Sequence, residues 1–261
     1  MKIIKRIFTF CLIIFSFSKA NSSCARDGIS VFPKSNNIYT NSIILIEGYA
    51  ESQTIIKELG KNNPVYLKNG RNKIKLLVKE ILIGQFNLTQ AILVPERNLK
   101  KDREYLLVIE NLPRGEKLER WNSALGKLEP IVYKVNNSLD TLAPKFATIP
   151  KEIRKTYINY GCGPSVNVEF ECKVIEDHDF LIEAILKDLG TGKELKYYFK
   201  SEKEILEIGH GMCSGAYLFS NSENYEIELS LIDFSSNRTN WKGDRLKFTK
   251  PREENSIRKP R

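Results

Sequence analysis

Residues 209–215, with the sequence GHGMCSG, hold the side chains best suited to chemistry. His210 and Cys213 stand three positions apart, and a thiolate beside an imidazole is the arrangement of a cysteine nucleophile and its base. The three glycines allow a tight turn and a close approach by another group. The competing interpretation is that Cys213 forms a disulfide, because exported thiols are usually oxidised. A cystine cannot act as a nucleophile, so the cellular compartment decides between the two.

The first twenty residues predict export. Lys2, Lys5 and Arg6 precede an apolar run over residues 7–17, and small residues stand at the two positions that a signal peptidase reads. A helix needs about 20 apolar residues to span a bilayer, and this run is shorter. We therefore expect a cleaved signal peptide and a mature protein that is periplasmic, on the cell surface or secreted.

Cysteine usage agrees with an oxidising compartment. Removal of the signal peptide leaves Cys24, Cys162, Cys172 and Cys213, which allow three disulfide connectivities. Cys162–Cys213 is the favoured pair, because both residues lie in glycine-containing turns and can meet at one end of a sandwich. Cys24 is alternatively a candidate for lipidation, although the leucine usual in bacterial lipoprotein signals is missing. Membrane attachment is expected only in that case.

The net charge of +9 does not indicate a nucleic-acid-binding protein. The signal peptide carries four of the positive charges and no acid, so the mature chain has a formal charge of +5. Residues 242–261 alone account for an excess of five positive charges, which leaves the body close to neutral. A basic tail by itself carries no base-reading element, so we expect a solvated or surface-adhering terminus.

Most of the chain has the pattern of β-strands. Apolar residues alternate with polar ones over residues 166–174, and residues 42–48, 73–83, 86–94, 180–186 and 216–219 are strand-like. Leu99 precedes Tyr105 by six residues, and Phe219 precedes Tyr225 by the same spacing, which predicts a tyrosine corner in each half. The predicted organisation is a signal peptide (1–20), two β-sandwich domains (21–140 and 141–250) and a basic flexible tail (251–261).

These two corners resemble the feature that marks fibronectin type III-like and bacterial immunoglobulin-like modules. The ending of residues 231–237, LIDFSSN, resembles the close of many exported bacterial sandwich modules. Ile227 stands where antibody domains place their second core cysteine, so the interior disulfide of those domains is absent. The resemblance implies an all-β fold of two consecutive immunoglobulin-like sandwiches that serve as a spacer, an adhesin part or a ligand-binding surface. It implies no catalytic residue and no cofactor.

Two further clusters have a functional and a simpler interpretation. Asp177, His178 and Asp179 are metal-ligand types in a loop, but adjacent residues rarely complete a coordination shell, so a solvated turn is favoured and no metal is expected. Exposed aromatic residues would suit a sugar or a peptide, although most aromatic residues of a sandwich are partly buried. The candidate binding loop and aromatic residues are His210, Gly211, Ser214, Tyr197, Tyr198 and Trp241, with Trp121 as a further tryptophan.

The sequence thus favours an exported, non-enzymatic protein that acts in binding, adhesion or envelope structure. Its expected partner is a protein or glycan at the cell surface or in the periplasm. A small secreted hydrolase or metal-dependent enzyme with a site near His210 and Cys213 is the alternative. An inhibitory module that presents a loop would suit the same fold, but no residue supports it.

Overall fold

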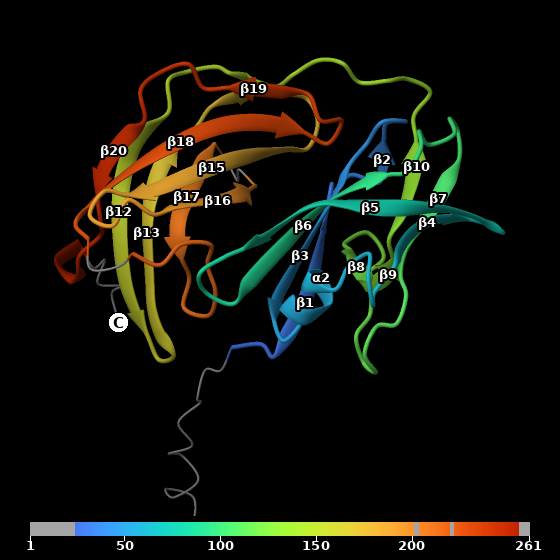
Figure 1. The fold of residues 1–261 in the computed structure, drawn as a ribbon, viewed down its shortest axis with the longest axis horizontal. Helices are drawn as coiled ribbons and strands as arrows, with labels where there is room; N and C mark the ends of the chain where they lie inside the picture. Colours follow the sequence, from blue (N-terminus) through green and yellow to red (C-terminus); the bar gives the residue numbers. More distant parts are fainter. Residues whose placement is uncertain (1–23, 201–203, 220–221, 256–261) are drawn as a thin grey trace, which may run out of the picture.

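The computed structural model describes residues 24–200, 204–219 and 222–255, which form two groups of strands joined by one connection (Figure 1). The predicted signal peptide lies outside these residues. The first group comprises β1 (Asp27–Phe32), β2 (Asn37–Ile38), β3 (Ile44–Ala50), β4 (Val65–Asn69), β5 (Asn72–Ile83), β6 (Leu88–Pro95), β7 (Glu104–Ile109), β8 (Glu119–Asn122), β9 (Lys127–Pro130) and β10 (Val132–Val135), with the short helix α2 (Gln53–Lys57).

The second group comprises β11 (Lys145–Phe146), β12 (Lys151–Tyr160), β13 (Gly163–Glu171), β14 (Val174–Ile175), β15 (Phe180–Asp188), β16 (Glu194–Phe199), β17 (Ile205–His210), β18 (Asn224–Asp233), β19 (Arg238–Asn240) and β20 (Leu246–Thr249). A single turn, η1 (Glu253–Asn255), follows, and Asn159 of β12 donates a hydrogen bond to Glu253 (3.1 Å). Among the described residues, no helix has the length and apolar character needed to cross a membrane.

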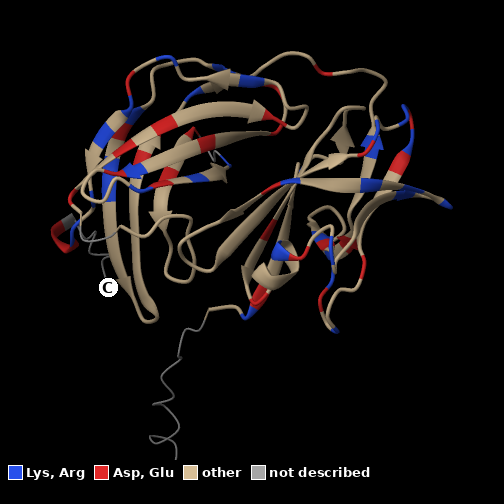
Figure 2. Cartoon of the chain, viewed as in Figure 1, with Lys and Arg blue, Asp and Glu red and all other residues tan. Residues whose placement is uncertain are grey.

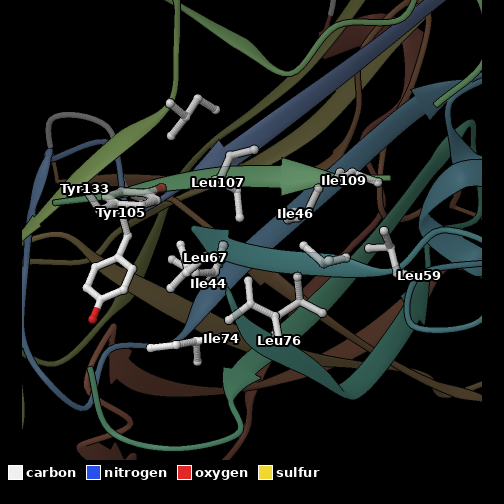
Figure 3. Close-up of a cluster of buried hydrophobic side chains, with 14 of the residues drawn as sticks. Ile44, Ile46, Leu59, Leu67, Ile74, Leu76, Tyr105, Leu107, Ile109 and Tyr133 are labelled. Carbon is white, nitrogen blue, oxygen red and sulfur yellow. The ribbon is translucent and has the colours of Figure 1, made fainter. Parts of the chain in front are cut away.

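The first half has a sheet of eight strands that curls into two layers, in the order β1-β3-β6-β5-β4-β7-β10-β2, and β8 and β9 form a separate two-stranded sheet. Strand β5 belongs to both layers, because its first residues pair with β4 and its later ones with β6. The register shifts between Val78 and Glu80, and such irregularities bend a strand. Ile44, Leu67 and Leu76 come from three different strands and meet in the core between the layers (Figure 3).

The second half is a sandwich of two separate sheets. One has the order β12-β13-β17, and the other has the order β16-β15-β18-β19 with β20 also paired to β18. Phe170 and Leu206 from the first sheet pack with Leu229 from the second in one buried cluster. Strand β17 was not expected from the sequence, and residues 216–219, expected as a strand, are irregular. The all-β, immunoglobulin-like sandwich fold predicted from the sequence is confirmed.

Both tyrosines of the predicted corners are core residues. Tyr105 is 3% exposed, and its hydroxyl accepts a hydrogen bond from the backbone amide of Lys100 (3.2 Å), beside the buried Leu99. This geometry is that of a tyrosine corner. Tyr225 is buried as well, and the ring of Phe219 packs edge-on against it with centroids 5.2 Å apart.

Charges of both signs are spread over the strands of both halves (Figure 2). Many form exposed ion pairs, such as those between Glu110 and two lysines, Lys68 and Lys73. Exposed pairs contribute little to stability, about 0 to 1 kcal/mol each. The pattern agrees with a nearly neutral body and shows no face of a single sign in this view.

Gln90 of β6 joins the two halves through a pair of hydrogen bonds. Its side-chain oxygen accepts from the backbone amide of Tyr198 in β16 (2.9 Å), and its side-chain nitrogen donates to the Tyr198 carbonyl (3.0 Å). The amide of Gln90 therefore pairs with an edge strand as a peptide group of a neighbouring strand would. Gln90 is 1% exposed, so these bonds are shielded from water.

A small apolar cluster surrounds this contact. Its buried members come from both halves: Phe32, Ile43, Leu45, Ile92, Leu181, Tyr198 and Phe234. The predicted boundary at residue 140 falls in the connection between β10 and β11, and Asn41 and Asn237 both donate hydrogen bonds to the Asp140 carbonyl (3.0 and 3.2 Å). Because the halves share buried residues, independent folding of each domain stays a prediction.

Replacing Gln90 by methionine is expected to weaken the junction. The change Gln90→Met keeps the side-chain length but leaves a buried donor and a buried acceptor of Tyr198 without partners, at a cost of about 3 kcal/mol. Urea denaturation of the whole chain measures this loss.

Gln85→Met is the matched control. Gln85 also crosses between the halves, accepting from the Leu218 amide (2.6 Å), but this bond is exposed. We expect its loss to cost less than about 1 kcal/mol. Equal losses in the two variants would contradict the role given to Gln90.

Candidate functional site: a cleft between the two sandwiches

The glycine-rich segment 209–215 is a junction between the halves. Gly211 donates to the Ser214 carbonyl (2.8 Å), which closes a tight turn after β17. Gly215 and Phe86, in the β5–β6 connection, exchange backbone hydrogen bonds of 2.8 and 3.1 Å. A side chain on Gly215 would place its Cβ 2.2 Å from the Cβ of His210, so only glycine fits this crossing.

Cys213 forms its disulfide with Cys24, and the favoured Cys162–Cys213 pairing is wrong. The turns that contain Cys162 and Cys213 do lie near each other, since a Cβ on Gly163 would be 3.8 Å from the Met212 carbonyl oxygen. Cys24, just before β1, nevertheless reaches Cys213, with 5.6 Å between Cα atoms, across 189 positions of sequence. Local turn patterns carry no information about so distant a partner. Cys162 lies exposed in the β12–β13 turn.

The positions of Cys172 and Cys24 limit what these two cysteines can do. Cys172 is 1% exposed in the core of the second sandwich, where burial raises the pKa of its thiol to about 12 and disfavours the reactive thiolate. Because the sulfur of Cys24 is bonded to Cys213, it cannot also carry a thioether-linked lipid. The lipidated form of Cys24 therefore does not fit this structure.

His210 cannot act as the base of a Cys213 nucleophile, because Cys213 is bonded to Cys24. Its Nδ1 lies 2.9 Å from the Gly211 carbonyl oxygen, an interaction in which the ring nitrogen donates, and Phe86 packs edge-on against the ring. The sulfur of Cys213 cannot form a thiolate while it is in the disulfide. The arrangement positions the imidazole at the edge of a cleft and does not form a thiolate–imidazole pair.

This cleft has a volume of about 490 Å³ and lies between the outer faces of two sheets. One wall comes from β3 and β6 of the first half, and the other from β12, β13 and β17 of the second. Strand β16 supplies Tyr197 and Tyr198 to its floor. The polar and charged lining residues are Glu47, Gln90, Arg154, Asn167, Glu169, Tyr197, Tyr198, Lys200, Glu207 and His210.

Fixed polar groups face the cleft from both walls. Arg154 binds Glu169 through two nitrogen–oxygen contacts of 3.0 and 2.8 Å. On the opposite wall, Glu47 accepts hydrogen bonds from Gln90 and from the Tyr197 hydroxyl, each 3.0 Å long. Burial, together with the nearby charge of Glu47, raises the pKa of Tyr197 far above its usual range, so the hydroxyl stays a donor.

The structure separates the residues of the predicted binding loop. His210, Gly211, Tyr197 and Tyr198 line the cleft, whereas Ser214 is not part of its lining. Trp241 packs edge-on against Phe146 (5.3 Å between centroids), and its indole nitrogen donates to the Asp244 carbonyl. The exposed fractions of Tyr197 and Tyr198 are 2% and 7%, so neither ring is an open stacking surface.

The Asp177–Asp179 loop also lies at the junction. The hydroxyl of Tyr39 is 2.9 Å from Nε2 of His178, and the amide of Ser35 donates to Asp179 (2.7 Å). Within the described part of the chain, no group of three or more histidine, cysteine or acidic residues is arranged to hold a metal. The loop makes contacts between the halves.

The sequence patterns did not identify three residues that line the cleft, Glu47, Gln90 and Arg154. Gln90 had one signal, because it interrupts an otherwise apolar run in β6, LTQAILVP. Arg154 and Glu169 are cross-strand partners, and their pairing depends on a register that shifts between Glu152 and Arg154. Local patterns do not set that register.

Comparison with known proteins adds little to this geometry. No family model matches the chain, and a search of curated proteins finds no match. Solved structures with some similarity include a Bacillus subtilis pullulanase complexed with maltose (10% identity, 87% of this chain, 25% of that chain, TM-score 0.26). Others are the tandem Ig repeats of Dlar (11% identity, 84% and 96%, TM-score 0.23) and the S-layer protein SbsC (13% identity, 78% and 23%, TM-score 0.26). The chain spans about a quarter of the pullulanase.

A disulfide-mapping experiment checks the covalent junction. Proteolysis of the unreduced protein is expected to release a peptide pair joined through Cys24 and Cys213, and a Cys162–Cys213 pair would contradict the structure. The variant Cys24→Ser is expected to lose about 3 to 5 kcal/mol in urea denaturation, because the bond closes a long loop. The exposed change Cys162→Ser is the control, with an expected loss below about 0.5 kcal/mol.

Glu183, on β15 beside Tyr198, gives the folded state a pH-dependent stability. It pairs across β15–β16 with Tyr198 and binds Arg238 through contacts of 2.8 and 2.5 Å. Burial by itself raises the pKa of Glu183, but the hydrogen bonds and charge of Arg238 outweigh it and hold the pKa below the ordinary 4.5. The ionised carboxylate therefore stabilises the folded state above pH about 4.5, and this contribution is lost as the pH falls through the lower, folded-state pKa.

The variant Glu183→Gln tests this dependence. At pH 7 we expect it to cost about 2 kcal/mol, because the charge-assisted bonds to Arg238 are weakened. The difference from wild type should stay constant down to pH about 5 and shrink below pH about 4. Urea denaturation across this range measures it, and Glu152→Gln, which removes an exposed pair with Lys155, should cost less than about 0.5 kcal/mol throughout. A difference that grows in acid would contradict the assignment.

Proposed function

We propose that this chain is an exported, non-enzymatic binding protein that uses the cleft between its two sandwiches to hold a partner at the cell surface or in the periplasm. The observation that carries the proposal is the cleft of about 490 Å³, which has polar groups fixed on both walls. Clefts at domain junctions with a few convergent polar groups are the usual location of binding sites. The partner class is a protein segment or a glycan.

The cleft is built for binding without rearrangement. The Cys24–Cys213 disulfide, the Gln90–Tyr198 pair and the backbone bonds between Phe86 and Gly215 hold its walls together from separate positions. Fixing the walls in advance reduces the entropy that a ligand must remove on binding. An adhesin or envelope component benefits from this rigidity.

Charge favours a ligand with hydroxyl or cationic groups. Three acids, Glu47, Glu169 and Glu207, line the cleft, and Arg154 is already engaged with Glu169. Carboxylate oxygens accept hydrogen bonds from sugar hydroxyls and from lysine or arginine side chains. Apolar lining from Leu45 and Leu88 leaves room for the carbon skeleton of either ligand.

The disulfide also supports export. Disulfides form and persist in oxidising compartments, which agrees with the signal peptide predicted at residues 1–20. The same bond removes the thiol on which the hydrolase alternative depended, because the sulfur of Cys213 is already bonded. No observation in the described residues favours that alternative over binding.

Reversing one charge in the cleft tests the proposal. Glu207 is exposed on β17 and lines the cleft, so Glu207→Arg is expected to reduce binding of the purified protein to envelope fractions of the source cells by about tenfold or more. The readout is retention of labelled protein at increasing concentration.

Glu254→Arg is the matched control, because it makes the same charge change at an exposed position outside the cleft. It should bind as wild type does. Equal retention of Glu207→Arg and wild type, or no saturable retention of wild type, would contradict a binding role for the cleft.

A further inference from the structure

Strand β1 is an edge strand with few of the usual features that prevent pairing. It lies at the end of the eight-stranded sheet and bonds to β3 alone. Its sequence, DGISVF, contains no lysine or proline, and its pairing with β3 is continuous without a bulge. Edge strands normally carry such features because an open row of backbone groups is a template for another strand.

The other described sheet edges are shorter, charged or covered. Strand β12 carries Lys151, Arg154 and Lys155, and β2 and β19 have two and three residues. The first half covers β16 through Gln90, and the Tyr217 amide donates to the Gly209 carbonyl at the end of β17. Strand β1 has six residues, and the guard at its outer edge is the Arg120 side chain, which donates to the Val31 carbonyl (3.3 Å).

The backbone groups of β1 that point away from β3 belong to its odd-numbered residues. The Arg26 carbonyl accepts from the Glu51 amide, and the Gly28 amide donates to the Ser52 hydroxyl, so even-numbered residues face β3. Backbone groups alternate along a strand, so Ile29 and Val31 direct their N–H and C=O groups away from β3. Arg120 approaches the Val31 carbonyl from that outer side (3.3 Å).

A hollow of about 480 Å³ lies beside this edge. Ile29, Ser30 and Val31 form one side, and Glu119 and Trp121 of β8 contribute to the other. Neighbouring strands lie about 4.8 Å apart, so one added strand requires a space of this kind. Trp121 is 61% exposed, and its cross-strand partner Leu128 on β9 is 57% exposed, which makes this hairpin an apolar wall.

The end of the hollow near Pro33 is positively charged. Arg120 gives its hydrogen bonds to the carbonyls of Val31, Pro33 and Lys34, and to Asn36 and the Tyr133 hydroxyl. Neither Arg120 nor Lys34 forms an ion pair with a carboxylate among the described residues. Burial and the neighbouring charges of Arg120 and Lys200 lower the pKa of Lys34, and the charges of Glu47 and Asp179 oppose this shift. A carboxylate beside Lys34 and Arg120 would offset the repulsion between these cations.

We propose that the free edge of β1 and the β8–β9 hairpin form a groove that binds an extended segment of a partner protein as an additional strand. The segment places an apolar side chain against Trp121 and a carboxylate near Lys34 and Arg120. Main-chain hydrogen bonds to the N–H and C=O of Ile29 and to the N–H of Val31 supply affinity, because the Val31 carbonyl already accepts from Arg120. The alternate side chains supply specificity. This surface is separate from the cleft, so the two proposals fail independently.

Selection from a phage-displayed library of random heptapeptides tests the groove. The target is the whole chain, and counter-selection uses Ser30→Lys, which places a guarding charge on the exposed edge. We expect enriched peptides to alternate apolar and polar residues and to carry an acidic residue at one end. Failure to enrich any sequence that distinguishes wild type from Ser30→Lys would overturn the proposal.

Tryptophan fluorescence then locates the bound peptide. Trp121 and Trp241 are the two tryptophans of the chain, so Trp241→Phe leaves Trp121 as the reporter. An enriched synthetic peptide should shift this emission to shorter wavelength with saturation. Trp121→Ala should weaken binding, measured by calorimetry, by about tenfold or more.

Three further variants separate the outcomes. Ile29→Pro removes one outward N–H and should also weaken the peptide, and circular dichroism and urea denaturation confirm that the variant is folded. Ser138→Lys adds the same charge at an exposed position that lines neither the hollow nor its neighbour, and it should bind as wild type does. Loss of peptide binding in Glu207→Arg, which would place the peptide in the cleft, would overturn the proposal. Concentration-dependent dimers that Ser30→Lys abolishes would also overturn it, because the occupant would then be a second copy of this chain.

Discussion

The structure depends on the pairing of one buried side-chain amide with one backbone amide. Gln90 on the outer face of the first sandwich bonds to both polar groups of Tyr198 on an edge strand of the second. A buried amide left unpaired costs free energy, so the two sandwiches are stable in the arrangement that satisfies it. The surrounding apolar cluster excludes water from these bonds. This contact joins β6, in one wall of the cleft, to β16 of the second sandwich.

The junction combines interactions of different kinds, and this explains the glycine-rich segment. Gly215 allows the β5–β6 connection to cross close to His210, and the nearby Cys213 ties Cys24, which precedes β1, to the same place. The glycine-rich segment 209–215, which suggested catalysis, therefore holds the two sandwiches together. The proposed binding function would gain from this arrangement, because the recognition surfaces keep their geometry before a partner arrives.

The two proposed surfaces would recognise partners in different ways. The cleft offers side-chain carboxylates and amides on facing walls, which suits a ligand with several hydrogen-bonding groups. The β1 groove offers backbone groups of Ile29 and Val31 beside the exposed Trp121, which suits an extended chain. Both surfaces lie on the first sandwich, whereas the second sandwich contributes to the cleft alone. Together, the two proposed surfaces would allow the chain to hold two partners at once.

The sequence determined the class of the fold, because alternation of apolar and polar residues is local and repeats every two positions. It also predicted the buried Leu99 and Tyr105 and the tight turn around Gly211, all within a few residues of one another. Only the tertiary structure decided that Cys213 bonds to Cys24 and that Gln90 meets Tyr198, contacts that span 189 and 108 positions. The cleft belongs to this second kind, since its walls come from strands whose packing no local pattern encodes. Distant contacts are fixed by the closure of the whole fold, and a short stretch of sequence carries no record of its partner.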